Sequence, residues 1–267
     1  MTEKKVQKLI FFDIDGTLLD DATKSMPESA AEAIRVAREN GHICLVNTGR
    51  TKRMVGSGLL EQAEFDGYLM GCGTMIVYRG ELLLHKTLTL ELSERIMEAL
   101  KRYHIDAILE GREENFIDKQ ENMYTTTFKR FAKGYNALNY APYEEAGGQY
   151  DKLFVYADEQ ESIDAFRREF YEELDFIDRE RGFYEVVPKG YSKATAMEYI
   201  ADKLQIPMEH TVAIGDSNND LPMLQCAHIG IAMGNSSKEV LEIADYITTD
   251  VDKDGIRNAL KWLGVLD

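Results

Sequence analysis

The sequence is short of cysteine, of positive charge and of long apolar runs. Its three cysteines, Cys44, Cys72 and Cys226, form no CxxC motif and their number is odd, which favours a reducing cytoplasm. No run of 18 apolar residues is present, so we expect no transmembrane helix. The 31 basic residues against 47 acidic ones give a net charge of −16. That charge argues against nucleic acid or an anionic membrane as a partner, because both need a basic face.

The start of the chain also lacks the pattern of a secretory signal. Its short apolar run meets Asp13 too soon for a signal peptide, so we expect a cytoplasmic protein. The 267 residues, 44% hydrophobic and 29% charged, are ordinary for a globular protein with one large or two modest domains. A small anionic substrate is compatible with the net charge, because it needs only a few local cations. We expect a monomer or a weak homodimer.

Predicted strands and helices alternate at both ends of the chain. Before residue 82, four apolar strands and two helices are predicted, at 8–12, 27–41, 43–46, 52–61, 68–70 and 75–78. After Pro188, four helices alternate with three strands, at 192–204, 211–214, 219–226, 229–232, 236–243, 246–247 and 255–263. Ser192 and Ser236 are the expected N-caps of two of these helices. Continuous apolar strands between helices predict a parallel sheet covered on both faces.

The pattern changes between about residues 82 and 187. Short strands and two helices are predicted there, at 82–84, 91–103, 105–110, 115–118, 153–157, 163–170 and 183–187, with an irregular, aromatic-rich stretch at 124–150. We therefore predict an α/β fold. A Rossmann-like parallel sheet core, formed by residues 1–81 and 188–267, is interrupted by an inserted α+β cap domain at 82–187.

Two aspartates follow the first predicted strand, where residues 10 to 17 are IFFDIDGT. Ligands of open parallel sheets bind at the carboxyl ends of strands, and a carboxylate there, Asp13, can attack phosphorus. Asp15 is close enough to protonate the leaving oxygen and then to deprotonate water. Gly16 permits the tight turn, and Thr17 offers a hydroxyl and an N–H. The alternative interpretation is an Asp-Gly turn after a strand, with Thr17 as a local cap.

A second acidic cluster, GDSNND at 215–220, follows the apolar run at 212–214. Mg²⁺ prefers oxygen ligands and usually takes one or two carboxylates, leaving room for waters and a substrate phosphate. Two carboxylate clusters at two strand ends therefore predict a Mg²⁺-dependent phosphoryl-transfer site that includes Asp216. The alternative is a polar loop followed by an N-capped helix.

Two further residues have the chemistry to hold a phosphoryl group. Thr48 follows a strand and can donate a hydrogen bond to a phosphate oxygen, although Asn47-Thr48-Gly49 alone would be a plain helix-capping loop. Lys193, near the start of a helix, can neutralise the phosphoryl group as a compact cation. A lone lysine in that position is usually only solvated.

The order of these motifs is more specific than any one of them. Asp-x-Asp-Gly-Thr, then a Thr after a strand, then a Lys, then Gly-Asp-x-x-x-Asp resembles the haloacid dehalogenase (HAD) superfamily. The large insert between the Thr and the Lys resembles its Cof-type (class IIB) sugar-phosphatase-like branch. The strings DIDGT, NTGR, PKGYSK, GDSNND and AMGNSSKEVLEIADYIT fit that branch, and the resemblance covers nearly the whole chain.

The resemblance implies a role for each candidate residue. Asp13 would be the nucleophile and Asp15 the general acid and base. The implied metal set is Asp13, Asp15 through its backbone carbonyl, Asp216 and Asp220, the last of which would orient a metal-bound water or Lys193. Thr48 and Lys193 would hold the phosphoryl oxygens, with Thr17, Gly49 and Asn219 on the phosphate side. Arg50 belongs to the TGR string and is expected to be structural or to lie at the cap interface.

The sequence departs from the branch at one tripeptide. The branch usually has Asn-Gly-Ala after the third strand region, and this chain has Cys72-Gly73-Thr74. We expect the substitution to leave the phosphate chemistry intact. It removes an Asn that often shapes the substrate side of the site.

The function predicted from these residues is a Mg²⁺-dependent phosphatase. Its substrates would be small phosphorylated metabolites, such as sugar phosphates, and it would act through an aspartyl-phosphate. Two alternatives stay open: a phosphomutase, which would release an isomer instead of phosphate, and a non-catalytic phospho-ligand sensor, which need not keep both Asp13 and Asp15. Aromatic and basic residues of the insert, between Tyr124 and Tyr143, could form a substrate wall or pack the cap's own sheet. No residue of the insert identifies a particular sugar, nucleotide or cofactor phosphate.

Overall fold

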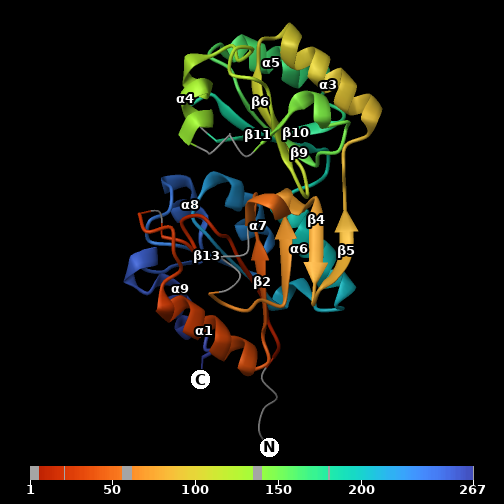
Figure 1. Cartoon of the computed structure of the whole chain (residues 1–267). Coiled ribbons are helices and arrows are strands. Elements are labelled where there is room, and N and C mark those ends of the chain that lie inside the picture. The colour runs from red at the N-terminus through yellow and green to blue at the C-terminus, as the bar shows by residue number, and fades with distance from the viewer. Residues whose placement is uncertain (1–5, 21, 56–61, 135–139, 180, 267) are drawn as a thin grey trace, which may run out of the picture. The chain divides into compact units, whose positions relative to one another are not determined.

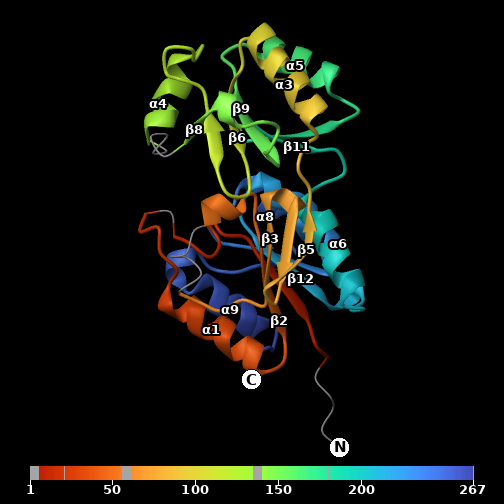
Figure 2. The same cartoon turned by 45° about the vertical axis from the view of Figure 1, so that its right-hand side comes forward.

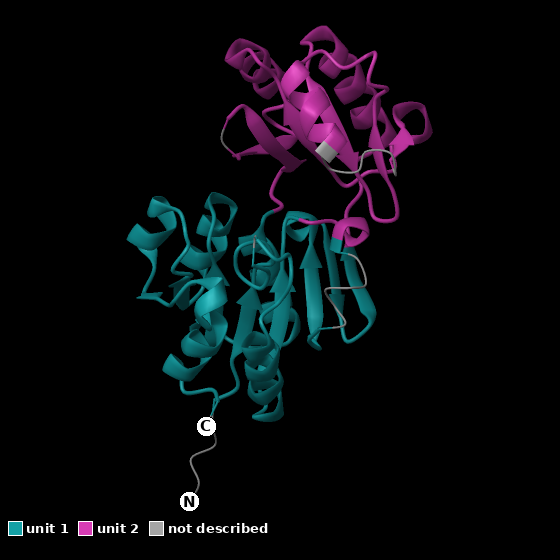
Figure 3. Cartoon of the chain, turned by 60° about the vertical axis from the view of Figure 1, so that its left-hand side comes forward, with its two compact units in different colours: residues 1–49, 55–84, 192–267 teal, residues 50–54, 85–191 magenta. Residues whose placement is uncertain are grey.

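The computed structural model describes residues 6–20, 22–55, 62–134, 140–179 and 181–266. They form two compact units, one of residues 1–49, 55–84 and 192–267 and the other of residues 50–54 and 85–191 (Figure 3). Within the described ranges, no helix has both the length and the apolar character needed to cross a membrane.

The first unit is built on an eight-stranded sheet of order β14-β13-β12-β1-β2-β3-β4-β5 (Figure 1). Its strands are β1 (Leu9–Phe12), β2 (Ile43–Asn47), β3 (Gly67–Met70), β4 (Met75–Tyr78), β5 (Glu81–His85), β12 (Thr211–Gly215), β13 (Ile229–Ala232) and β14 (Tyr246–Ile247). The six strands from β14 to β3 are parallel, and β4 is antiparallel to β3. The chain moves outward from β1 in both directions, so the topological switch point lies at β1 and β12.

The central strand β1 explains why this sheet is covered on both faces. Ile10 and Phe12 belong to the core on one face, and Leu9 and Phe11 to the core on the other. The first face is covered by α1 (Glu28–Glu39) and α9 (Gly255–Trp262), and the second by α6 (Lys193–Lys203), α7 (Leu221–Cys226) and α8 (Lys238–Ile243) (Figures 1 and 2). The α/β fold class predicted from the sequence is confirmed.

Two helix predictions in this unit need comment. The helix expected at 236–243 with Ser236 as its cap begins instead at Lys238, with Ser237 at the N-cap and no side-chain cap bond. The helix itself is present, but the cap prediction was wrong, because Ser236 Oγ donates to the Gly215 carbonyl and Ser237 Oγ donates to Asn218 Oδ1. Of the helix expected at 52–61, residues 52–55 are helical and 56–61 lie outside the described residues.

The second unit contains a six-stranded sheet of order β10-β11-β9-β6-β7-β8. Its strands are β6 (Asp106–Glu110), β7 (Asn115–Ile117), β8 (Ala141–Pro142), β9 (Lys152–Tyr156), β10 (Leu174–Asp178) and β11 (Phe183–Pro188). All neighbours are antiparallel except β7 and β8. Helices α3 (Leu90–Arg102) and α5 (Gln160–Glu169) pack on one face, and α4 (Thr126–Gly134) packs on the other.

The stretch at 124–150 is more regular than the sequence indicated. It contains α4, whose Phe128 and Ala132 lie one helical turn apart and are both fully buried. Strand β10 was also not predicted. The core sheet continues through β5, a few residues past the expected boundary at 82.

Candidate active site

The two acidic loops meet because their strands are neighbours. Asp13 follows β1 and Asp216 follows β12, and these strands pair in parallel from Leu9 with Thr211 to Phe12 with Ile214. The Asp13 N–H donates to the Ile214 carbonyl at 3.0 Å, which extends the pairing to Asp13. Carboxylate oxygens of Asp13, Asp216 and Asp220 lie within 4.8 Å of one another. The carboxyl ends of the two strands thus bring together residues that are about two hundred positions apart in the sequence.

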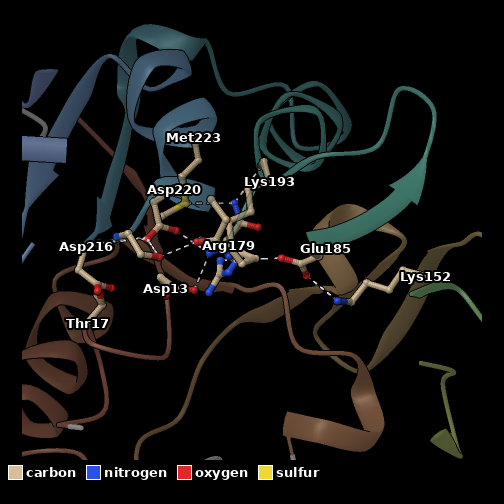
Figure 4. Close-up of polar contacts among 12 residues, drawn as sticks. Asp13, Thr17, Lys152, Arg179, Glu185, Lys193, Asp216, Asp220 and Met223 are labelled. Atoms are coloured by element: carbon tan, nitrogen blue, oxygen red, sulfur yellow. Dashed lines mark hydrogen bonds and ion pairs between the residues drawn. The ribbon is translucent and has the colours of Figure 1, made fainter. Parts of the chain in front are cut away.

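Lys193 lies between two of these carboxylates (Figure 4). Its Nζ is 2.6 Å from Asp13 Oδ1 and 2.5 Å from Asp220 Oδ1, and its side chain is 1% exposed. Burial alone would lower the pKa of Lys193, but Asp13 and Asp220 raise it above its usual range. The lysine is therefore a fixed positive charge and not a proton donor at neutral pH.

The position of Lys193 follows from helix capping. Ser192 is the N-cap of α6: its Oγ accepts the Thr195 N–H at 3.1 Å, and Thr195 Oγ1 accepts the Ser192 N–H at 2.9 Å. This capping box confirms the predicted cap and fixes Lys193 as the first helical residue. Asn47, the last residue of β2, donates from Nδ2 to the Lys193 carbonyl at 2.9 Å. The capping box and the Asn47 hydrogen bond together fix the backbone of Lys193.

Asp220 uses both of its oxygens inside the protein. Oδ1 accepts from Lys193, and Oδ2 accepts the backbone N–H groups of Asp216 and Ser217, each at 3.0 Å. The side chain is completely buried. These contacts fit a residue that orients the lysine and shapes the loop.

The turn after Asp13 is fitted closely to Asp216. Thr17 Oγ1 donates to Asp216 Oδ1 at 2.9 Å (Figure 4). Gly16 has φ +75°, and a Cβ on this residue would lie 2.3 Å from Asp216 Oδ2. Only glycine permits both the backbone conformation and the approach of the carboxylate. The Thr17 hydroxyl, expected on the phosphate side, is thus engaged with Asp216.

The site carries more negative than positive charge. Burial, with repulsion from Asp220, raises the pKa of Asp13 to about 7 although Lys193 opposes the shift. Burial, with repulsion from Asp13, raises the pKa of Asp216 to about 8. Carboxylates that are held this close and buried need a cation between them to be ionised together. Oxygen donors with excess negative charge are what Mg²⁺ requires, so these residues fit the metal that the sequence predicts.

The other predicted residues lie on the loops around this cluster. Thr48, which is buried, follows β2; its N–H donates to Leu69 at 2.8 Å and its carbonyl accepts from Cys72 at 3.0 Å. Gly49 follows it. Asn219 Oδ1 accepts from Ser217 Oγ at 2.7 Å. Asp15 is partly exposed in the turn between Asp13 and Gly16.

Three residues near this cluster were missed or left without a role by the sequence interpretation. Asn47 lies in the NTGR string and Asn235 in the AMGNSS string, and the sequence predicts no role for either. Cys72 has a left-handed backbone, φ 54°, and is close enough to the Lys193 ammonium to interact with it electrostatically. The tripeptide in which this chain departs from the Asn-Gly-Ala pattern therefore lies beside the proposed phosphate-binding lysine. The adjacent Gly73 is required, because a Cβ there would lie 2.6 Å from the Ser192 carbonyl.

A lysine between buried carboxylates at a topological switch point is compatible with the binding of a phosphoryl group. Comparison with known proteins identifies the family. The family model of haloacid dehalogenase-like hydrolases matches residues 10–260. The 5-amino-6-(5-phospho-D-ribitylamino)uracil phosphatase YitU of Bacillus subtilis is 27% identical over 273 residues, which cover 95% of this chain and 96% of that protein. The chain belongs to the family of haloacid dehalogenase-like hydrolases.

Solved structures share the whole fold. BT1666 of Bacteroides thetaiotaomicron, described among phosphatases of the HAD superfamily, superposes with a TM-score of 0.86 at 27% identity and covers 99% of this chain and 97% of its own. The HAD subclass IIB sugar phosphatase BT4131 has a TM-score of 0.82 at 24% identity, covering 97% of this chain and all of its own. The recognition made from the motifs, and the expectation of a hydrolase, are confirmed.

Proposed function

We propose that this chain is a Mg²⁺-dependent phosphatase that hydrolyses small phosphorylated metabolites through an aspartyl-phosphate on Asp13. The observation that carries the proposal is the buried Lys193 ammonium held between Asp13 and Asp220, with Asp216, which follows β12, held by Thr17 in the turn after β1. Membership of the hydrolase family and the phosphatases among its relatives support phosphatase activity in general. The metal, the covalent step and the substrate class belong to the proposal.

Two steps would complete the reaction. In the first, an Asp13 oxygen forms a bond to phosphorus while the ester oxygen leaves and takes a proton from Asp15. In the second, Asp15 removes a proton from water, the water oxygen attacks phosphorus, and the bond to Asp13 breaks to release inorganic phosphate. Lys193 binds one oxygen of Asp13 and would contact the transferring phosphoryl group, which lowers the repulsion between two anions. Thr48, Gly49 and Asn219 would bind the remaining phosphate oxygens.

Mg²⁺ would be held by Asp13, Asp216 and the backbone carbonyl of Asp15. It would supply positive charge that offsets the carboxylates and the incoming phosphate. We assign Asp220 to the orientation of Lys193, because its oxygens already accept from the lysine and from two backbone N–H groups. Thr17 acts on the metal side, through Asp216.

We further propose that the insert at 82–187 is the cap and selects the leaving group. One face of its sheet carries a buried polar cluster, which we define as Glu110, Asn115, Lys152 and Glu185. Lys152 Nζ lies 2.5 Å from both Glu110 Oε2 and Glu185 Oε1. The register pairs Glu110 with Lys152 on one side and with Asn115 on the other, so these side chains share a face.

Asn115 is the most informative member of this cluster. It is completely buried, and neither its Oδ1 nor its Nδ2 has a hydrogen-bond partner among the described residues. A buried amide without partners costs about 1–3 kcal/mol, which a ligand that offers both donors and acceptors would offset. Polyhydroxylated leaving groups have that chemistry, and a ribityl chain and a sugar occur in the substrates named for YitU and BT4131.

The deciding experiment measures phosphate release from a panel of phosphorylated metabolites with Mg²⁺ and with excess EDTA. We expect turnover of sugar or polyol phosphates with Mg²⁺ only. Full activity in EDTA would refute the metal role, an isomeric phosphate as product would identify a phosphomutase, and binding without turnover would identify a sensor. A monomer or weak homodimer in the cytoplasm completes the proposal. The net charge of −16 supports one further part of it, the expectation that neither nucleic acid nor an anionic membrane is a partner.

A further inference from the structure

The loop after β13 contacts both acidic loops of the site. We call residues 233–237 the clamp loop. On the side of Asp216, the Met233 N–H donates to the Gly215 carbonyl at 3.1 Å and the Ser237 N–H donates to the Asp216 carbonyl at 2.9 Å. Ser237 Oγ also donates to Asn218 Oδ1 at 3.0 Å. These three hydrogen bonds join the clamp loop to the GDSNND loop.

Asn235 joins the clamp loop to the other acidic motif. Its Nδ2 donates to the Gly16 carbonyl at 2.8 Å, and its Oδ1 accepts the Val251 N–H at 3.1 Å. Each end of the amide thus binds a backbone group of a different segment, which fixes its orientation. A side chain with only a donor or only an acceptor would satisfy one of the two.

Gly16 connects the Asn235 hydrogen bond to the proposed metal site. Its neighbours in the chain are Asp15, whose carbonyl is a proposed ligand, and Thr17, whose hydroxyl holds Asp216. A Cβ on Gly16 would lie 2.3 Å from Asp216 Oδ2, so little space separates this turn from the Asp216 carboxylate. A shift of the turn would therefore change the spacing between the ligands contributed by the two loops.

We propose that Asn235 is a positioning residue that sets the spacing of the two acidic loops through Gly16, and thereby sets the affinity of the site for a divalent cation. The inference rests on the proposed function, because it takes the Asp13, Asp15 and Asp216 oxygens as the metal ligands. Asn235 itself contacts backbone, and it acts only through other residues. Loss of such supporting contacts typically weakens metal binding about 10- to 100-fold.

The test compares Asn235→Ala and Asn235→Asp with the wild-type chain, all stripped with chelator. Calorimetric titration with MgCl₂ gives the dissociation constant directly, without turnover. We expect both variants to bind Mg²⁺ at least about 10-fold more weakly. The Asp variant keeps the acceptor for Val251 and loses the donor to Gly16. Its added negative charge would by itself tighten cation binding, so weaker binding would identify the lost Gly16 contact as the cause.

Asn258→Ala is the matched control. Asn258 also bridges two groups, donating from Nδ2 to Thr249 Oγ1 at 2.9 Å and to the Lys253 carbonyl at 3.3 Å, in the same unit. We expect its Mg²⁺ affinity to stay within about twofold of wild type. With saturating Mg²⁺, the KM of the Asn235 variants for an activated ester should also change little, because Thr48, Gly49 and Lys193, which would bind the phosphate, lie outside the two acidic loops.

The outcomes separate this inference from the function on which it rests. If the wild-type chain binds no Mg²⁺, the proposed metal site is wrong and the inference fails with it. If the wild type binds Mg²⁺ and a folded Asn235 variant binds within twofold of it, only the positioning role is overturned, whatever its melting temperature. Should the Ala variant fail to fold, the nearly isosteric Asp variant decides alone.

Discussion

Lys193 is the residue on which the electrostatics of the site depends. One buried ammonium contacts two carboxylates, while a third, Asp216, lies close by and is held by Thr17. The negative charges outnumber the positive one, and burial, followed by repulsion between the carboxylates, raises the pKa values of Asp13 and Asp216. A phosphate dianion would worsen the imbalance, which is why a divalent cation is the natural complement of this cluster.

The nucleophile can be tested by the pair Asp13→Asn and Asp15→Asn. An amide at position 13 cannot attack phosphorus, so we expect phosphate release to fall by at least about 10³-fold with the fold intact. At position 15 the amide removes the proton donor and acceptor, so a phosphoenzyme should form with a good leaving group and then hydrolyse slowly. Acid-quench trapping of labelled enzyme distinguishes the two variants. Near-normal turnover by Asp13→Asn would rule out the covalent mechanism.

The stability of the metal-free protein should depend on pH in a direction set by the same carboxylates. Asp13 and Asp216 have folded-state pKa values of about 7 and 8, against 3.8 ordinarily. The folded state therefore binds protons that the unfolded state releases, and stability is lost as pH rises from about 4 to about 8. Bound Mg²⁺ would remove this penalty.

The increase in melting temperature caused by Mg²⁺ should accordingly be larger at about pH 8 than at about pH 5. Thermal scans with Mg²⁺ and with EDTA at both pH values measure it. Other buried acids titrate in the same way with Mg²⁺ and with EDTA. The difference between the two melting temperatures at one pH therefore reports on the metal site alone. An equal increase at the two pH values would contradict the assignment of the carboxylates as ligands.

At the scale of elements, the N-cap of α6 is next to a proposed catalytic residue, because Ser192 caps the helix and Lys193 is its first residue. Ser192→Ala removes the acceptor for the Thr195 N–H and should lower the free energy of unfolding by about 1 kcal/mol. It should also lower kcat, because Lys193 is the next residue. Thr89→Ala is a matched control: Thr89 caps α3 by accepting the Leu92 N–H at 3.3 Å, and α3 carries none of the proposed chemistry. Equal losses of kcat in the two variants would show that capping does not position the lysine.

The elements also show what the sequence could and could not reveal. The apolar strands before Asp13 and Asp216 were predictable because their hydrophobic runs are continuous and each ends in a polar motif. Helix α4 was missed because its aromatic residues, spread over a polar stretch, suggested an irregular segment. Asn47 and Asn235 were missed for a different reason. Their hydrogen bonds reach Lys193 and Gly16, which are 146 and 219 positions away in the sequence, and no local pattern encodes such contacts.

At the scale of the whole molecule, we propose that the first unit carries out the reaction and that the second unit selects the leaving group. All the residues assigned to the chemistry belong to the first unit, and the buried polar cluster belongs to the second. The cap boundaries expected at 82 and 187 can be refined for an experiment. Strand β5 belongs to the core sheet and Ser192 caps α6, so a deletion should keep residues up to 85 and from 191 onward.

Replacing residues 86–190 by a short flexible linker should leave a core that folds, because the eight-stranded sheet and its covering helices stay complete. We expect this core to hydrolyse p-nitrophenyl phosphate and to lose its preference among natural metabolites. The measurement is kcat/KM for the activated ester and for the best metabolite, in the shortened and the full chain. Unchanged discrimination by the shortened protein would refute the cap assignment.

The full chain offers a version of the same test that does not depend on the shortened core. In Asn115→Leu a buried amide without partners is replaced by an apolar side chain of similar size, so stability should rise by about 1 kcal/mol if packing is kept. If the amide binds the leaving group, kcat/KM for the best metabolite should fall at least about tenfold, the loss of roughly one good hydrogen bond, while the activated ester is unaffected. A more stable protein with unchanged metabolite kinetics would show that the polar cluster does not select the substrate.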